Sequence, residues 1–299
     1  MRTMAPFRHV DVFATAPYRG NGLIVVFADI LDHPAEQLRR VAEELRQFET
    51  IFVSTTAATT DVRARIFTVE EELPFAGHPV IGAAAVLHER TAPGTSRMAW
   101  RFTIGGRAIP VHSEIDGEYF TAAMDQGRPQ QSPPLPEAAR TQAAESLGLD
   151  RADLLPLPLQ VWSTGLPYLI VPVTPAGLSR ARVHVRDLEP WLAQLGAKFL
   201  YVLDPDAREG RTWDNAGTVE DVATGSAAGP AAAYLLANGL AAADRIELSQ
   251  GRFVGRPSSI AVTGGDDGHM WVGGPVRPVA SGSLDALPEG PAGTDPSGG

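Results

Sequence analysis

The sequence predicts an α+β protein of two similar domains, each with a sheet curled around one helix rich in alanine and glycine. The first observation is an internal repeat: residues 72–87 read ELPFAGHPVIGAAAVL, and residues 220–235 read EDVATGSAAGPAAAYL. Gly77 and Gly225 hold the same place in the two copies, 148 positions apart (225 − 77) in a chain of 299 residues. The second observation is that several short strand-like segments accompany each helix. The third is that small residues in both helices would let strands approach closely.

The first half of the chain predicts strands and helices in alternation. A helix is indicated where Leu38, Val41, Ala42 and Leu45 form an apolar stripe with charged residues on the other face. The expected strands are 9–14, 23–28, 48–53 and 64–69, with a turn at 18–22, and the expected helices are 34–47 and 79–89.

The second half repeats this order. It predicts a strand at 168–173, a helix at 185–195, a strand at 199–203, a turn-rich segment at 204–217 and the helix that opens at Gly225. The strand at 51–53 matches 199–202 at the same offset of 148, so the repeat extends beyond one motif. A doubly wound parallel sheet is the alternative that the pattern leaves open.

These elements divide the chain into three parts. We expect an N-terminal domain at 1–125, a C-terminal domain at 126–286 and a disordered tail at 287–299. The C-terminal domain would begin with a linker rich in proline and glutamine, residues 126–136.

The composition is that of a globular protein that binds small molecules. Hydrophobic residues make up 44% and charged residues 20%, and the formal charge of −10 argues against binding to nucleic acid. Residues 1–16 lack the apolar core of a signal peptide, and the uncharged run 225–243 is too weakly apolar for a membrane span. We therefore expect a cytoplasmic enzyme with no membrane contact.

Several kinds of chemistry are excluded. The chain has no cysteine, which rules out disulfides, thiolate catalysis and zinc–sulfur sites. Glycine-rich nucleotide-binding motifs are absent, and the seven histidines show no metal-ligand spacing. The sequence therefore predicts neither a cofactor nor a metal.

Glu49 is the first candidate for catalysis. In a strand with period two it shares a face with Ile51 and Val53, and both faces of this segment are largely apolar. Burial would favour the protonated carboxyl group and raise the pKa of Glu49, which suits a group that gives and takes a proton. The alternative is a glutamate at a frayed strand end that points to solvent.

His78 and Asp221 are further candidates. His78 lies in the first turn of the first repeated helix, where it could donate to a substrate oxygen or shuttle a proton, and where we expect it to be neutral. It could equally be a structural histidine. Asp221 precedes the second repeated helix and could orient a substrate, or it could simply compensate the helix dipole. In an extended segment its neighbour Glu220 faces the other way.

The two helix starts are candidate anion sites. The first N–H groups of a helix lack intrahelical partners, and the dipole there favours negative charge. Gly77 opens one such helix, and Gly225 and Ser226 open the other, where they could hold a carboxylate. Ordinary N-capping would use the same atoms.

The segments around these candidate residues resemble the signature sequences of the phenazine-biosynthesis PhzF-like family. The resemblance rests on Glu49–Val53 (ETIFV), on ELPFAGHP at 72–79 and on EDVATGSAAG at 220–229, and extends from about residue 9 to 283. It implies the diaminopimelate-epimerase-like fold: two pseudo-symmetric domains, each a barrel-like, mostly antiparallel sheet around a central helix, with the active site between them. Members are cofactor-independent and typically homodimeric.

The resemblance also implies roles for individual residues. Glu49 matches the proton-transferring glutamate that replaces the cysteine pair of related epimerases. His78 and Asp221 match other catalytic residues, whereas Gly77, Gly225 and Ser226 match positions that bind the substrate. The implied activity is that of an isomerase that shifts a proton and a double bond in a small unsaturated, cyclic carboxylic acid of bacterial specialised metabolism, such as antibiotic biosynthesis. A one-base epimerase, a lyase and a non-catalytic binding protein remain alternatives.

Overall fold

The computed structural model describes residues 4–28, 33–54, 60–242 and 244–285, and all structural statements refer to these. The chain forms two compact units. Unit 1 takes the N-terminal segment up to Val12, Asn21–Ala122 and the segment from Pro275; unit 2 takes Phe13–Gly20 and Ala123–Gly274. The predicted boundary after residue 125 stays a prediction, and the expected tail at 287–299 lies outside the described residues.

Unit 1 is a closed barrel of eight strands. The strand order is β1-β2-β3-β4-β6-β7-β8-β16, and β16 also pairs with β1, which closes the ring. The short β5 pairs with β4. The elements of this unit are β1 (Ala5–Val12), β2 (Asn21–Phe27), α1 (Ala35–Leu45), β3 (Glu49–Ser54), β4 (Asp61–Phe67), β5 (Glu72–Leu73), α2 (Gly77–Thr91), β6 (Arg97–Ile104), β7 (Arg107–Asp116), β8 (Tyr119–Asp125) and β16 (Met270–Leu284), of which β8 and β16 continue into unit 2.

Unit 2 contains a second sheet of similar arrangement. Its strand order is β16-β15-β14-β13-β12-β11-β10-β9. Its elements are β9 (Gln130–Gln131), α3 (Glu137–Leu147), η1 (Arg151–Asp153), β10 (Gln160–Ser163), β11 (Pro167–Pro172), α4 (Pro175–Arg180), α5 (Glu189–Gln194), β12 (Phe199–Asp204), β13 (Glu209–Arg211), α6 (Gly225–Ala237), β14 (Arg245–Gln250), η2 (Arg252–Val254) and β15 (Ser258–Gly264).

The 148-residue repeat is reproduced in the register of the strands. In unit 1, β4 and β6 are parallel with Asp61 opposite Arg101; in unit 2, β13 and β14 are parallel with Glu209 opposite Ser249. Both partners are displaced by 148 (61 + 148 = 209, 101 + 148 = 249). The pairs β2–β3 and β11–β12 are also parallel, whereas most other pairs are antiparallel. The α+β prediction is confirmed, and the doubly wound alternative is wrong.

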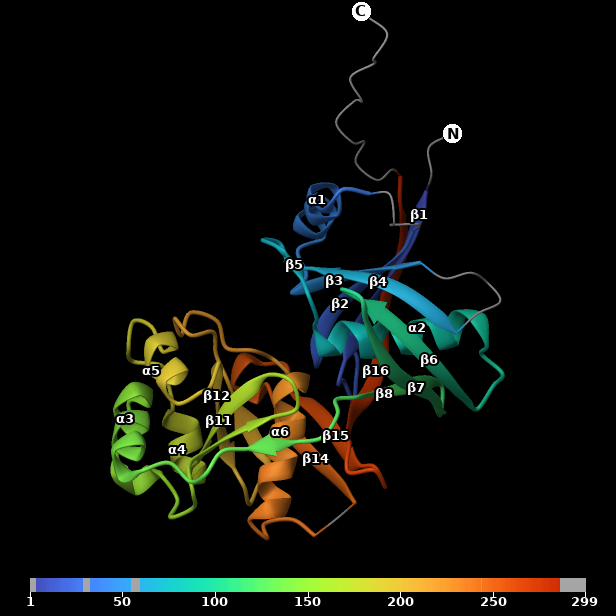
Figure 1. Ribbon diagram of the computed structural model, residues 1–299. Helices are drawn as coiled ribbons and strands as arrows, with labels where there is room; N and C mark the ends of the chain where they lie inside the picture. Colours follow the sequence, from blue (N-terminus) through green and yellow to red (C-terminus); the bar gives the residue numbers. More distant parts are fainter. Residues whose placement is uncertain (1–3, 29–32, 55–59, 243, 286–299) are drawn as a thin grey trace, which may run out of the picture. The chain divides into compact units, whose positions relative to one another are not determined.

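Each unit encloses one of the two repeated helices (Figure 1). Helix α2 contacts β1, β2, β3, β6 and β7, and α6 contacts β10, β11, β12, β14 and β15. Small residues make this possible: a Cβ added at Gly82 of α2 would lie 2.4 Å from Leu23 Cδ2, and one at Gly229 of α6 would lie 2.3 Å from Gln126 Oε1. In unit 1, where Leu23 belongs to β2, the predicted close approach of a strand to the helix is therefore confirmed.

In unit 1, α1 covers the face of the sheet opposite α2. Its buried Leu38, Val41 and Ala42 pack in one cluster with Phe52 of β3 and Phe67 of β4. Strand β3 therefore has a helix on each side, which explains its nearly continuous burial from Thr50 to Val53.

Three segments differ from the prediction. The helix expected at 185–195 is reduced to α5, which begins only at Glu189 next to a proline. The turn-rich segment 204–217 contains the short strand β13. Residues 126–136, expected to be a linker, are tied to the sheet through β9 and backbone hydrogen bonds such as that from Ser132 N–H to Val161 O, 2.8 Å.

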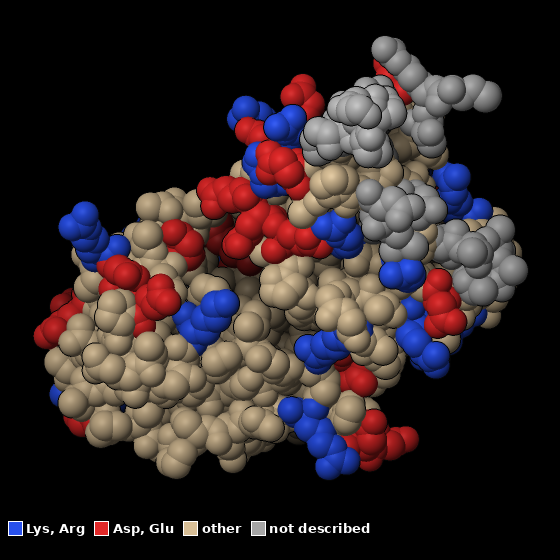
Figure 2. All heavy atoms as spheres, turned by 45° about the horizontal axis from the view of Figure 1, so that its top comes forward, with Lys and Arg blue, Asp and Glu red and all other residues tan. Residues whose placement is uncertain are grey.

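Acidic side chains are concentrated on part of the surface. On the face drawn in Figure 2, aspartate and glutamate side chains gather more densely than lysine and arginine, in keeping with the formal charge of −10. Among the helices of the described residues, none has the length and apolar character needed to cross a membrane.

Candidate active site

In unit 1 the structure brings Glu49 and His78 together. Glu49 is the first residue of β3, and His78 is the second residue of α2. Glu49 Oε2 and His78 Nε2 are 3.0 Å apart, and the side chains are only 18% and 7% exposed. Glu49 therefore faces the central helix, and the alternative of a glutamate pointing to solvent is wrong.

The pKa of Glu49 is lowered, not raised as the sequence suggested. Burial is the largest influence and raises the pKa, but the positive charge and the N–H group of His78 lower it by more in sum. The prediction failed because it considered the apolar strand and not a partner from a helix about thirty residues away in sequence. The expectation of a neutral His78 stays a prediction.

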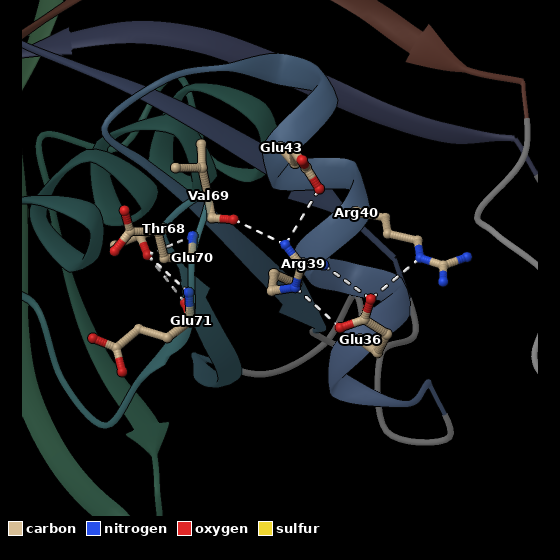
Figure 3. A network of polar contacts seen from close by, with 8 residues as sticks. All are labelled: Glu36, Arg39, Arg40, Glu43, Thr68, Val69, Glu70 and Glu71. Atoms are coloured by element: carbon tan, nitrogen blue, oxygen red, sulfur yellow. Dashed lines mark hydrogen bonds and ion pairs between the residues drawn. The ribbon is translucent and has the colours of Figure 1, made fainter.

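The segment that leads into α2 is fastened to α1 (Figure 3). Thr68 Oγ1 accepts from the N–H groups of Glu70 and Glu71, at 3.1 and 3.0 Å, which closes a tight turn. Arg39 of α1 donates to Val69 O at 3.0 Å and also binds Glu36, whose pKa this bond lowers to about 2. The chain therefore enters Gly77 from an anchored turn.

In unit 2, Asp221 lies within the turn that precedes α6. Its Oδ2 accepts from the hydroxyl of Thr224 at 2.6 Å, and its Oδ1 from the N–H of Ala223 at 3.4 Å. Asp221 is partly exposed, so the carboxylate both organises the helix start and reaches the surface of the unit. Both proposed roles of Asp221, orientation of a substrate and support of the helix start, are compatible with this position.

The side chain of Glu220 points away from that of Asp221, as predicted for neighbouring residues of an extended segment. It binds Arg211 with two hydrogen bonds of 2.8 and 2.7 Å, and Arg211 is fully buried over the rings of Trp213 and Phe253. Glu220 therefore belongs to the interior of unit 2.

Gly225 and Ser226 form the first turn of α6. The amides of Ala227 and Ala228 donate to Thr224 O, whereas those of Gly225 and Ser226 are the N–H groups that a helix leaves without an intrahelical partner. A Cβ at Gly225 would lie 3.1 Å from the ring of Phe13, so glycine fits this crowded place.

The hydroxyl of Ser226 is oriented by a buried tyrosine. Ser226 Oγ and Tyr168 Oη are 2.6 Å apart. Burial, together with the charge of Asp221, raises the pKa of Tyr168 far above its ordinary value, against a smaller lowering by Ser226. Tyr168 therefore remains a protonated phenol that holds Ser226 in place.

The sequence predicted some of the residues that gather at each of the two helix starts. It placed Glu49, His78 and Gly77 in unit 1, and Asp221, Gly225 and Ser226 in unit 2, and the structure gathers each set at one helix start. It missed Tyr168, Thr224 and Gln250, because hydrogen bonds between side chains of separate segments leave no local pattern. Within the described ranges, no group of three His, Asp or Glu residues is placed to hold a metal ion.

Solved structures place this architecture in a known class. A structure described as a predicted epimerase from Pseudomonas aeruginosa matches with a TM-score of 0.86 and 47% identity, covering 95% of this chain and 99% of that one. A hydroxyproline epimerase from Agrobacterium vitis, 12% identical, shares the fold with a TM-score of 0.60, covering 95% of this chain and 92% of that one. The fold is therefore the diaminopimelate-epimerase-like one.

The particular family follows from sequence comparison. The family model described as phenazine biosynthesis-like protein, PhzC-PhzF, matches residues 10–270. A protein of Salmonella typhimurium named uncharacterized isomerase YddE is 34% identical over 85% of this chain and 88% of its own length. The trans-2,3-dihydro-3-hydroxyanthranilate isomerase of Pseudomonas chlororaphis is 32% identical over 83% and 86%. The chain belongs to the PhzC-PhzF family and is a PhzF-like isomerase.

Proposed function

We propose that this protein is a cofactor-independent isomerase in which Glu49 transfers a proton within a small unsaturated, cyclic carboxylic acid. The observation that carries the proposal is the buried pair of Glu49 and His78, 3.0 Å apart at the start of α2. His78 lowers the pKa of Glu49, so the carboxylate is ionised near neutral pH and can begin the reaction as a base.

The proposed reaction conserves all atoms of the substrate. The carboxylate of Glu49 takes a proton from one carbon, and the C–H electron pair moves into the conjugated system, which shifts the double bond. The carboxyl group of Glu49 then returns the proton to a second carbon. His78 stabilises the charge on Glu49 at the start and the end, and such acid–base transfer contributes about 10²–10⁴-fold to the rate.

The substrate carboxylate has a candidate partner in unit 2. We assign it to the amides of Gly225 and Ser226 at the start of α6, with Asp221 orienting a polar group of the substrate. The amide of Gly77 in unit 1 is a second donor of the same kind. The name of the Pseudomonas chlororaphis relative, trans-2,3-dihydro-3-hydroxyanthranilate isomerase, describes a substrate of this class. We further propose that the protein acts as a homodimer in the cytoplasm, in a biosynthetic pathway of specialised metabolism.

The test is turnover of trans-2,3-dihydro-3-hydroxyanthranilate in D₂O, followed by NMR. We expect an isomer with a shifted double bond that carries solvent deuterium, and a rate at least about 10²-fold lower for Glu49→Gln. The exposed Glu36, which forms ion pairs on α1, gives the matched control, because Glu36→Gln should keep full turnover. Full activity of Glu49→Gln would remove Glu49 from the mechanism.

A one-base epimerase is the second candidate, favoured by the 47% identical structure described as a predicted epimerase. The same deprotonation by Glu49 would then be followed by return of the proton to the same carbon. Product analysis separates the outcomes: an inverted centre indicates epimerisation, a lost substituent indicates a lyase, and binding without deuterium uptake indicates a non-catalytic protein.

A further inference from the structure

We propose that Gln250 is a positioning residue that aims the carboxylate of Asp221 through the hydroxyl of Thr224. The proposal rests on the proposed function insofar as Asp221 serves the substrate. Gln250 ends β14, is 1% exposed and lies beside the start of α6, which β14 contacts (Figure 1).

The orientation of the Gln250 amide follows from its partners. Nε2 lies 3.0 Å from Asp221 O, which can only accept, and Oε1 lies 3.2 Å from Thr224 N–H, which can only donate. The two contacts require the same orientation of the amide. Tyr201 Oη adds a weaker contact to Oε1 at 3.4 Å.

The direction of the Thr224 hydroxyl follows in turn. The second N–H of Gln250 Nε2 donates to Thr224 Oγ1 at 2.9 Å, so this oxygen acts as an acceptor there. Its single proton then goes to Asp221 Oδ2, 2.6 Å away, in a short hydrogen bond to a charged group. The chain of donors therefore runs from Gln250 through Thr224 to Asp221, and each step has one direction.

The other copy of the repeat shows that the fold does not need this chain. Subtracting 148 from 221, 224 and 250 gives Leu73, Ala76 and Phe102, which are all apolar. Helix α2 nevertheless begins at Gly77, at the position equivalent to Gly225, after an extended Ala76 without a side-chain cap. A polar chain that only one copy carries, at the helix start proposed to hold the substrate, points to a role in function.

The test compares steady-state turnover of trans-2,3-dihydro-3-hydroxyanthranilate by four variants. Gln250→Met and Thr224→Val remove the chain with little change in shape, and each should lower kcat about 10–100-fold while KM changes less. Thr224→Ser keeps the hydroxyl and should restore kcat to within about threefold of wild type. Ser258→Ala is the control, because Ser258 of β15 donates only to backbone oxygens, Gln250 O at 3.0 Å and Val222 O at 3.3 Å, and not to the Gln250 amide, so it should keep kcat.

A double-mutant cycle gives the decisive comparison. If Gln250 acts through Thr224, the double variant Gln250→Met/Thr224→Val should be no slower than either single variant. Multiplied effects, or an unchanged kcat in Gln250→Met, would overturn the proposal. Gln250→Glu, which keeps the acceptor for Thr224 N–H but lacks the donors, should behave like Gln250→Met and serves if the methionine variant does not fold.

A second readout separates this proposal from the proposed function. In protein labelled with ¹³C-threonine, the Thr224 hydroxyl proton should exchange slowly in the wild type and in Ser258→Ala, and its signal should be lost in Gln250→Met. A signal that is absent from the wild type, or unchanged in Gln250→Met, contradicts the positioning role. If the wild type does not turn over the substrate, the proposed function fails, and the hydroxyl proton alone decides on Gln250.

Discussion

The starts of α2 and α6 are the same structure with different chemistry. Each helix begins at a glycine, and each second residue, His78 or Ser226 (78 + 148 = 226), reaches an ionisable side chain of the surrounding strands. In unit 1 that partner is the carboxylate of Glu49, at 3.0 Å; in unit 2 it is the phenol of Tyr168, at 2.6 Å. The first pair joins a carboxylate whose pKa is lowered to an imidazole, whereas the second, with its protonated tyrosine, offers only hydrogen bonds.

The glutamate five residues before each of these glycines shows the opposite case, an interaction that both copies of the repeat keep. Glu72 and Glu220, again 148 apart, each bind an arginine of the adjacent strand with two hydrogen bonds. The pair of Arg65 and Glu72 is partly exposed, whereas that of Arg211 and Glu220 is buried. An interaction kept in both copies is consistent with a structural role, and a difference between copies marks the residues to test for function.

The largest expected effect is on the buried copy of this ion pair. Arg211→Met leaves the charge of Glu220 buried without its partner, which should lower the free energy of unfolding by about 3–5 kcal/mol. Arg65→Met, the matched change in the exposed copy, should cost about 0.2–1 kcal/mol. Urea denaturation of both variants measures the difference. Equal losses would mean that burial does not distinguish the two pairs.

The next effect concerns a polar chain found only in unit 1. Trp100 Nε1 donates to Ser113 Oγ, Ser113 donates to His88 Nδ1, and His88 Nε2 donates to Thr95 O, each at 2.8 Å. The positions 148 further on are Leu236, Leu248 and Ala261, all apolar.

Ser113→Ala should leave two buried groups of this chain unpaired and lower the free energy of unfolding by about 1–3 kcal/mol for each. Thr91→Val, which removes only a hydroxyl bond to Leu87 O on the exposed side of α2, should change it by about 0.5 kcal/mol or less. Thermal or urea denaturation compares the two variants. A loss for Ser113→Ala no greater than that for Thr91→Val would show that the chain contributes little.

A smaller effect concerns the pH dependence of stability. The pKa of Glu49 is lowered from its ordinary value of 4.5, so its ionised form stabilises the folded state above pH 4.5, and this contribution is lost as the pH falls below that value. The stability of the wild type relative to Glu49→Gln should therefore decrease on acidification. In a His78→Phe background, burial alone acts on Glu49 and raises its pKa. The stability of that variant relative to His78→Phe/Glu49→Gln should therefore increase on acidification. Denaturation from pH 3 to 7 checks both; the same sign in both backgrounds would contradict the assignment.

The smallest effect concerns Thr50, next to Glu49 on β3. Its side-chain oxygen is fully buried, and among the described residues it has no hydrogen-bond partner. Thr50→Val replaces the hydroxyl by a methyl group of similar size in a strand, which should raise the free energy of unfolding by about 1 kcal/mol. The equivalent position in unit 2 is the exposed Lys198, where a change to threonine should have almost no effect. Destabilisation by Thr50→Val would indicate that the hydroxyl has a partner.

Much of the fold could be predicted because the repeat is local. A strand, a glycine and an alanine-rich helix are read from neighbouring residues, and the offset of 148 then predicts a second copy. The strands β6, β7, β14 and β15 were not predicted individually, although β6 and β14 alternate between buried and exposed residues, with Arg97, Arg101 and Glu247 on the exposed side.

The candidate site could be predicted as a set of residues but not as a set of contacts. Glu49 was correctly placed on the face of β3 shared with Ile51, but the direction of its pKa depends on His78, which the sequence does not place beside it. Tyr168 of β11 and Gln250 of β14 are far apart in the sequence, and only folding brings each of them to a residue at the start of α6, Ser226 and Thr224 respectively.

The ring of unit 1 is closed by two strands that lie far apart in the sequence, because β1 pairs with β16 and Ala5 lies opposite Leu284. Synthesis must therefore proceed past β16 before this barrel can be completed. The nascent N-terminal half would expose two unpaired strand edges while the rest is synthesised, and such edges are sites of aggregation. Contacts between such distant residues also make folding slow. Removal of β16 should therefore damage β1, although the two strands are more than 250 residues apart in the sequence.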